Sequence, residues 1–182
     1  MTEIALYVLD LVQNSIAAKA TKVMIDVDED ITNNLLTLTI EDNGRGMSEE
    51  TLKKVTSPYF TTRTTRKVGL GLALIQELCE GCGGALTITS IPNQGTTLKA
   101  TMQHDHIDRP ELGLMADTLY SIMIQDINLV YHHRYQNNQF HFDIKEIKQI
   151  LGDVSLQQVD VMRWIKDYIT EQIVQIKQTE EV

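Results

Sequence analysis

A stripe of apolar residues at helical spacing marks the start of the chain and predicts a helix over residues 3–18. The stripe consists of Ala5, Leu9, Val12 and Ile16. Asp10 and Asn14 are also four residues apart, so they share a second face of the same helix. The small side chains of Ala17 and Ala18 leave that face uncrowded, which makes this polar pair a candidate for binding chemistry.

Alternating apolar and polar residues predict two strands after this helix. The apolar positions are Val23, Ile25 and Val27 in the first strand and Leu36, Leu38 and Ile40 in the second. Asp42 has the same parity as the apolar residues of the second strand, so its carboxylate is expected to point toward the interior. A carboxylate in the interior is costly unless something hydrogen-bonds to it. We therefore expect a ligand at Asp42.

Capping residues and turns predict the rest of the first part of the chain. Ser48 is a good N-cap for a short helix that ends near Val55. Residues 57–68 have no clear periodicity and contain four Thr and three basic residues, so we expect a mobile loop there. The remaining predicted elements are a helix from Gly69 to about Leu78, strands near residues 85–90 and 96–102, and a turn at residues 92–95.

A polar segment that ends in Pro110 predicts a boundary in the chain. We expect a first unit over residues 1–103, a linker over 104–110 and a second unit over 111–182. In the second unit the pattern predicts a helix over 111–125, strands near 128–133 and 139–143, a short helix over 144–150 and a longer one over 155–177. Its apolar helical stripes either pack onto the first unit as core or present a face for docking a partner or forming a homodimer.

Composition and charge narrow the classes of function. The formal net charge of −9 argues against a nucleic-acid-binding protein, which needs a basic face. No apolar run approaches the roughly 18 residues of a membrane span. The N-terminal residues lack the basic segment of a secretion signal. We expect a cytoplasmic protein that contacts neither nucleic acid nor membrane.

The two cysteines, Cys79 and Cys82, have C-x-x-C spacing. This spacing is typical of a redox pair or of half a metal site, but no second pair exists to complete a tetrahedral site. The alternative is that both cysteines close a helix ahead of Gly83 and Gly84.

Short motifs follow one another along the first part of the chain. They are Asp10-Leu-Val-Gln-Asn14, Asp42-Asn-Gly-Arg-Gly46, Gly69-Leu-Gly71 and Gly95-Thr-Thr97. In this order they resemble the ATPase superfamily of gyrase, Hsp90, histidine kinases and MutL over residues 4 to about 102. The resemblance is closest to histidine-kinase-type and stand-alone anti-sigma-factor-type domains. It implies the Bergerat fold, an α/β (α+β) two-layer sandwich whose mixed sheet is covered by helices on one face, here with a small C-terminal α/β appendage.

The resemblance also implies ATP and Mg²⁺ as cofactors and gives roles to individual residues. Asn14 would hold the metal, and Asp42 would accept a hydrogen bond from the adenine amino group. Gly69 and Gly71 would let backbone amides approach phosphate at a helix N-terminus. Thr96 or its neighbour in the chain would hydrogen-bond near the adenine. The full set of expected nucleotide-binding residues is Asn14, Asp42, Gly44, Gly46, Met47, Phe60, Thr61, Arg63, Lys67, Gly69, Leu70, Gly71, Leu72 and Thr97.

Asp10 decides which function we expect. In hydrolysing and protein-kinase members of the superfamily, a Glu four residues before the metal-binding Asn activates water or the acceptor hydroxyl. Asp is one methylene shorter, and a general base must lie within hydrogen-bond reach of the proton that it takes. The chain is therefore either a Mg²⁺-dependent kinase or slow ATPase that acts on an unknown partner protein in signal transduction, or a catalytically silent, nucleotide-gated binding module.

Overall fold

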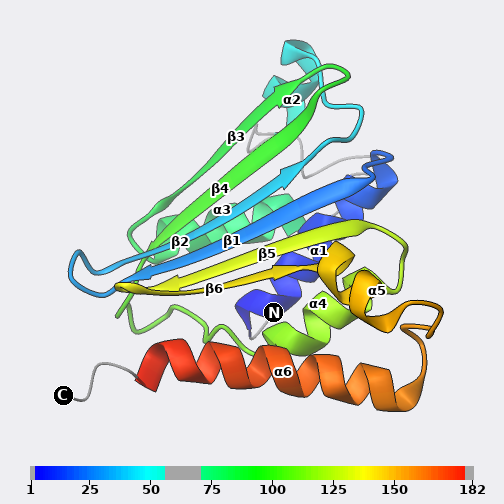
Figure 1. Ribbon diagram of the computed structural model, residues 1–182. Coiled ribbons are helices and arrows are strands. Elements are labelled where there is room, and N and C mark those ends of the chain that lie inside the picture. The colour runs from blue at the N-terminus through cyan, green and yellow to red at the C-terminus, as the bar shows by residue number, and fades with distance from the viewer. Residues whose placement is uncertain (1–2, 56–70, 179–182) are drawn as a thin grey trace.

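One mixed sheet of six strands runs through the computed structural model, which describes residues 3–55 and 71–178 (Figure 1). The strands are β1 (Lys22–Asp30), β2 (Leu35–Asp42), β3 (Ala85–Ile91), β4 (Gly95–Gln103), β5 (Asn128–Tyr135) and β6 (Asn138–Asp143). Their order across the sheet is β3-β4-β2-β1-β5-β6. All neighbouring strands are antiparallel except β1 and β5, which are parallel.

The helices lie mainly on one face of this sheet. They are α1 (Ile4–Ala17), α2 (Glu49–Val55), α3 (Gly71–Gly81), α4 (Met115–Met123), α5 (Ile144–Leu151) and α6 (Val159–Gln178). Helices α1 and α3 contact the β2–β4–β3 side, and α4 and α6 contact β5 (Figure 1). On β1 the side chains of Val23, Ile25 and Val27 are fully buried beneath the helices, whereas Met24 and Asp26 on the other face are half-buried. The expected two-layer sandwich with helices on one face is thus confirmed.

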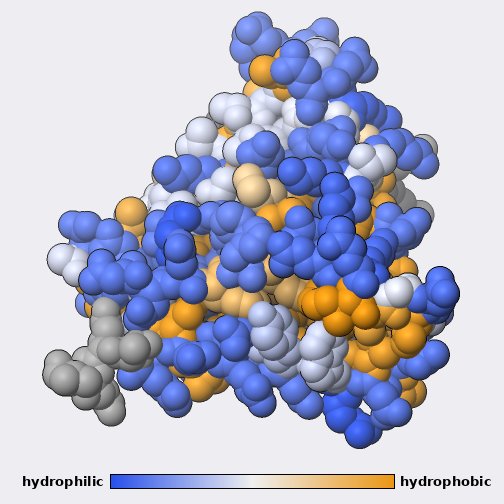
Figure 2. Space-filling view, in the orientation of Figure 1, coloured by the Kyte–Doolittle hydropathy of each residue, from blue (hydrophilic) through white to orange (hydrophobic). Residues whose placement is uncertain are grey.

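The other face of the sheet carries polar side chains. Figure 2 shows hydrophilic residues over most of the strands on this side. Arg134 on β5 donates to Asp26 and Asp28 on β1 at 2.9 and 3.0 Å, which neutralises part of the acidic surface. Period-two alternation along the strands therefore separates a buried apolar layer from a solvated polar one.

Helix α1 carries the first motif, and residues far along the chain fix where it begins. The amides of Ile4 and Ala5 donate to the carbonyls of Glu111 and Leu112 at 2.9 Å. These bonds satisfy donors that a helix leaves free in its first turn. Its buried face includes Val8 and Leu11 together with Ala5 and Val12 of the predicted stripe, whereas Leu9 and Ile16 of that stripe are half-buried.

The strands after the expected linker extend the same sheet. Strand β5 pairs with β1 over Lys22↔Asn128 to Glu29↔Tyr135, and its buried Leu129 and Tyr131 belong to the same core as β1. The parts of the chain before and after residues 104–110 therefore share one sheet and one core. We did not predict the pairing of β1 with β5 when we divided the chain into two units, because the alternation of residues along a strand does not specify which strand lies beside it.

Helix α6 packs its apolar stripe on the strands β5 and β6. Ile165 and Ile169 are fully buried, whereas Trp164 on another face is 45% exposed and stacks on Tyr168. This part of the second unit is core, and its role in docking or dimerisation stays a prediction.

None of the helices within residues 3–55 and 71–178 has the length and the apolar character that a membrane span requires.

Candidate functional site

A cavity of about 420 Å³ lies between α1 and the ends of the central strands. Its volume falls within the range of small-molecule sites. Residues from α1, β2, the loop after β2, α2, α3, β3 and β4 line it. We call it the α1–β2 cavity; its lining is Leu11, Asn14, Ser15, Ala17, Ala18, Ile40, Asp42, Arg45, Gly46, Met47, Ser48, Thr51, Val55, Leu72, Ile88, Thr96 and Leu98.

The carboxylate of Asp42 is held in one orientation by two donors. Ser15 Oγ donates to Oδ2 at 2.6 Å, and the backbone amide of Gly44 donates to Oδ1 at 2.8 Å. An ionised carboxylate has about four acceptor positions, so acceptor capacity remains for a ligand in the cavity. The side chain points to the helix side of the sheet, as the alternation in β2 predicted.

The loop after β2 is fastened to its surroundings by backbone contacts. Asn43 Oδ1 accepts from the amides of Thr21 and Lys22, both at 2.9 Å. The amide of Arg45 donates to the carbonyl of Ala18 at 2.9 Å, and so ties the loop to the end of α1. These bonds fix the polar end of the cavity before any ligand enters.

Two glycines of this loop are required by close packing against protein backbone. Gly46 has φ +61°, and a Cβ added there would lie 2.0 Å from the carbonyl oxygen of Ile91. A Cβ on Gly44 would lie 2.9 Å from the carbonyl oxygen of Ala18. The sequence predicted glycines that let the backbone approach a flat base, and the structure adds that these glycines also let the loop approach β3 and α1.

Thr96 lines the cavity, whereas its neighbour Thr97 does not. Thr96 has the parity of buried Leu98, and Thr97 has the opposite parity, which places it on the polar face of the sheet. The hydroxyl of Ser90 donates to the carbonyl of Gly95 at 3.0 Å and is hydrogen-bonded to Thr96 Oγ1 at 2.8 Å. Of the two threonines that the sequence offered, Thr96 is thus the one at the cavity wall, because one residue along a strand exchanges the two faces, and its contact with adenine stays a prediction.

Asn14 is a cavity residue with an unsatisfied polar atom. Its Nδ2 is buried and has no hydrogen-bond partner among the residues that the structure describes. Unpaired buried polar groups are rare because they cost free energy. An amide can exchange its nitrogen and oxygen by rotation, so this side chain can offer either a donor to phosphate or an oxygen to Mg²⁺.

Asp10 lies one helical turn before Asn14 and contacts the start of α3. A Cβ added to Gly71 would lie 1.8 Å from Asp10 Oδ2, so a side chain there would displace the Asp10 carboxylate. Leu72, the next residue, lines the cavity, whereas Asp10 itself does not. The structure thus brings the first and third motifs into contact.

A family match covers the part of the chain that builds this site. The family "Histidine kinase-, DNA gyrase B-, and HSP90-like ATPase" matches residues 2–106 of the 182. The chain belongs to this ATPase family. Its membership, together with the cavity between α1 and β2, makes ATP the expected ligand there.

Curated relatives resemble the ATPase part of the chain. A protein described as a sensor protein from Shewanella frigidimarina is 37% identical over 93 residues, which cover 50% of this chain and 14% of that protein. The sensor histidine kinase ZraS of Salmonella typhimurium is 34% identical over 89 residues, 48% of this chain and 19% of the relative. The chain therefore matches less than a fifth of the length of either relative.

Two solved structures were compared with the chain, and the first of them shares its fold. The N-terminal domain of a DNA repair protein has a TM-score of 0.51 at 17% identity, and the match covers 84% of this chain and 58% of that one. The catalytic domain of the histidine kinase ThkA is 28% identical with a TM-score of 0.42, over 55% of this chain and 65% of that one. The first match covers a larger share of the chain than residues 2–106, so it also supports the fold of part of the chain after residue 106.

Several expected nucleotide-binding residues lie outside the described part of the chain. These are Phe60, Thr61, Arg63, Lys67, Gly69 and Leu70, so their roles in nucleotide binding stay predictions. Ser15, Arg45 and Ser90 were not among the residues predicted from the sequence. Ser15 and Arg45 lie beside or inside recognised motifs, and Ser90 has no signal except its parity with the half-buried Leu86 and Ile88 of β3.

The two cysteines of the ATPase domain are buried free thiols. Burial raises the pKa of Cys79 to about 11, and burial also raises the pKa of Cys82. A thiol with a raised pKa is mostly protonated at neutral pH and reacts poorly. Of the two interpretations of the C-x-x-C spacing, this favours a packing role for Cys79 and Cys82 at the end of α3, and it disfavours a redox pair. Across residues 3–55 and 71–178, no group of three His, Cys, Asp or Glu side chains is placed to hold a metal ion.

Proposed function

We propose that this chain binds ATP with Mg²⁺ in the α1–β2 cavity and uses the nucleotide to regulate a partner protein in the cytoplasm. The observation that carries the proposal is the Asp42 carboxylate, which Ser15 and the Gly44 amide hold at the polar end of an otherwise largely apolar cavity. An oriented acceptor beside apolar walls suits a flat base that carries an amino group.

The other end of the nucleotide would face α1 and α3. Asn14 supplies a buried amide without a partner in the described residues, and it would hold Mg²⁺, whose other ligands are phosphate oxygens and water. The start of α3 offers backbone amides that favour anions. When bound, the metal would supply positive charge that screens the triphosphate.

In the first form of this proposal, the chain transfers the γ-phosphate to a partner protein or, slowly, to water. The attacking hydroxyl oxygen would bond to the γ-phosphorus, the bond from that phosphorus to the bridging oxygen of ADP would break, and Asp10 would accept the hydroxyl proton. The names of relatives such as the sensor histidine kinase ZraS support a role in signalling.

A second form is favoured by the position of Asp10. Its Oδ2 packs toward Gly71, and the side chain does not line the α1–β2 cavity. A carboxylate one methylene shorter than Glu that does not line the cavity is poorly placed to take a proton from a nucleophile bound there. In this form the chain is a nucleotide-gated binding module, and ATP controls the partner without turnover.

The variant Asp10→Asn separates the two forms. The experiment follows γ-labelled ATP with the purified full chain, Mg²⁺ and a lysate of the source organism, and it measures ATP affinity in parallel. For the kinase form we expect label on a second protein, lost in Asp10→Asn with ATP affinity kept, whereas Asp160→Asn on the exposed side of α6 keeps the label. ATP bound but intact, with no label on any protein, supports the binding module. Failure to bind ATP at all would overturn both.

A further inference from the structure

A second cavity of about 530 Å³ lies at the other end of β1 from the nucleotide site. Asp42 pairs with Val23 at the start of β1, whereas Glu29, which lines the second cavity, lies near the end of that strand. The remaining walls come from the segment between β4 and α4, from α4 itself, from β5 and from α6. We call it the α6 cavity, and the proposed ATP function uses none of its residues.

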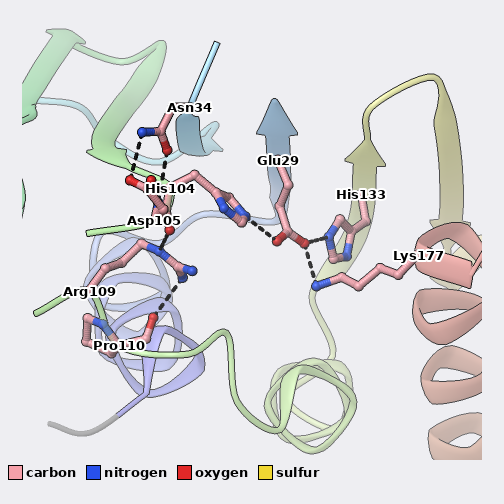
Figure 3. Close-up of polar contacts among 8 residues, drawn as sticks. All are labelled: Glu29, Asn34, His104, Asp105, Arg109, Pro110, His133 and Lys177. Atoms are coloured by element: carbon pink, nitrogen blue, oxygen red, sulfur yellow. Dashed lines mark hydrogen bonds and ion pairs between the residues drawn. The ribbon is translucent and has the colours of Figure 1, made fainter. Parts of the chain in front are cut away.

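A buried polar cluster forms one end of the α6 cavity (Figure 3). The Glu29 side chain is 4% exposed and accepts hydrogen bonds from His133 Nε2 at 2.8 Å and His104 Nε2 at 2.9 Å, and its Oε1 lies 2.6 Å from Lys177 Nζ. Burial alone would raise the pKa of Glu29, but the donors His133, Lys177 and His104 outweigh it and lower the pKa to about 2. The negative charge of Glu29 is therefore fully matched.

The cluster does not have the arrangement of a metal site. The two imidazoles approach different oxygens of Glu29 from opposite sides, and Lys177 reaches the same carboxylate from α6 (Figure 3). Asp117, another carboxylate of the lining, is paired with Lys166 at 2.6 Å. Glu111 is exposed at the rim. The buried lining thus offers no unmatched negative charge to a cationic ligand.

Arg109 supplies an unmatched positive charge to the same cavity. Its Nε donates to the carbonyl of His104, and Nη1 donates to the carbonyl of Pro110 at 2.9 Å. Both acceptors are neutral, and no carboxylate of residues 3–55 or 71–178 forms an ion pair with Arg109. The half-buried guanidinium is thus fixed in orientation while its Nη2 donors and its charge remain available.

We propose that the α6 cavity binds a small organic carboxylate with an apolar body, anchored by Arg109. The planar guanidinium matches a carboxylate with paired hydrogen bonds, and two backbone carbonyls already hold it in place. Lys177 at the buried end is already paired with Glu29, so Arg109 carries the anchoring charge. Leu112, Met115 and Ile173 provide the apolar wall for the rest of the ligand. The occupant would bridge the segment before α4 and the C-terminal helix α6.

The test uses hexanoate as the probe and the full chain labelled with ¹⁵N. Amide shifts are followed during titration with hexanoate, hexylamine and hexanol, which share the apolar body and differ in charge. We expect saturable shifts of Gly113 and Thr170 with hexanoate alone, and no shift of Gly44 and Gly46, which report on the nucleotide site. Equal binding of hexylamine, or hexanoate shifts confined to Gly44 and Gly46, would overturn the proposal.

Substitutions at Arg109 complete the test. Arg109→Gln should weaken hexanoate binding about tenfold or more, since hydrogen bonds between charged groups are lost. Arg109→Lys keeps the positive charge but lacks the planar guanidinium with its paired donors, so it should weaken hexanoate binding less than Arg109→Gln does. This second variant keeps the test valid if Arg109→Gln does not fold. Arg163→Gln, an exposed arginine of α6 outside the cavity, should leave binding unchanged. Hexanoate affinity that survives both Arg109 variants contradicts the role of the guanidinium.

Discussion

Ser15 Oγ lies 2.6 Å from Asp42 Oδ2, and this hydrogen bond joins α1 to the end of β2 across 27 residues of sequence. The bond sets the carboxylate at the angle from which its free acceptor positions face the α1–β2 cavity. Ser15 is buried, so water does not replace the hydroxyl easily if it is removed. The helix that carries Asn14 therefore also orients the group expected to bind adenine.

Removing this hydroxyl should weaken ATP binding. In Ser15→Ala, Asp42 loses its shortest donor, and the carboxylate can rotate away from the position that suits the base. A hydrogen bond to a charged group contributes roughly 1.5–3 kcal/mol, so we expect ATP affinity to fall by about tenfold or more. Isothermal titration calorimetry measures this. Ser121→Ala, whose hydroxyl donates to the carbonyl of Asp117, is the matched control and should bind ATP normally. If Ser15→Ala folds and its ATP affinity is unchanged, orientation of the Asp42 carboxylate by Ser15 does not contribute to ATP binding.

Replacing Asn14 should separate binding from stability. Asn14→Ala removes a buried amide nitrogen that has no partner among the described residues, so the free energy of unfolding without nucleotide should not decrease. The benefit of Mg²⁺ for ATP binding should disappear, because the variant lacks the expected metal ligand. ATP titrations with Mg²⁺ and with EDTA measure this difference. Gln13→Ala, an exposed amide on the same helix, should keep the Mg²⁺ dependence. A Mg²⁺ effect of wild-type size in Asn14→Ala contradicts the assignment.

The loop after β2 should not tolerate a side chain at Gly46. Its φ of +61° is unfavourable for other residues, and a Cβ would lie 2.0 Å from the carbonyl oxygen of Ile91. We expect Gly46→Ala to lower the free energy of unfolding by at least about 2 kcal/mol in urea denaturation. Gly81→Ala is the control, since a Cβ there meets nothing within 4 Å at the end of α3. That variant should be as stable as the native chain or slightly more stable.

Acid should destabilise the protein through Glu29. Its pKa is lowered from 4.5 to about 2, so its contribution to stability is complete above pH 4.5 and is lost as the pH falls toward 2. A shift of this size corresponds to roughly 3 kcal/mol of unfolding free energy. We expect Glu29→Gln to be less stable at neutral pH and its stability curve to converge with that of the native chain near the lowest pH. Urea denaturation at a series of pH values gives both curves.

The control for this prediction is an exposed carboxylate of α6. Glu171→Gln removes the same charge from the surface and should follow the pH dependence of the native chain. The prediction fails if the free energies of unfolding of Glu29→Gln and the native chain run parallel between pH 4.5 and about 2. In that case the pKa of Glu29 would be the same in the folded and the unfolded chain.

The sequence by itself determined the elements and the residues of the first site that depend on local spacing. Asp10 and Asn14 share a helix face because a helix repeats every 3.6 residues, and Asp42 points inward because a strand alternates its side chains. The ordered motifs were sufficient to predict the ATPase fold, which the family match confirms. These features are local, since backbone geometry over a few residues fixes them.

Only the tertiary structure decided which distant segments meet. It placed β5 beside β1, chose Thr96 over Thr97 for the cavity wall and gave Asp42 its partner Ser15. It also brought His133 to Glu29 across 104 residues, and α6 to both. Spacing along the chain carries no information about such contacts. They form where burial of apolar faces and pairing of buried polar groups are satisfied together, which depends on the whole fold.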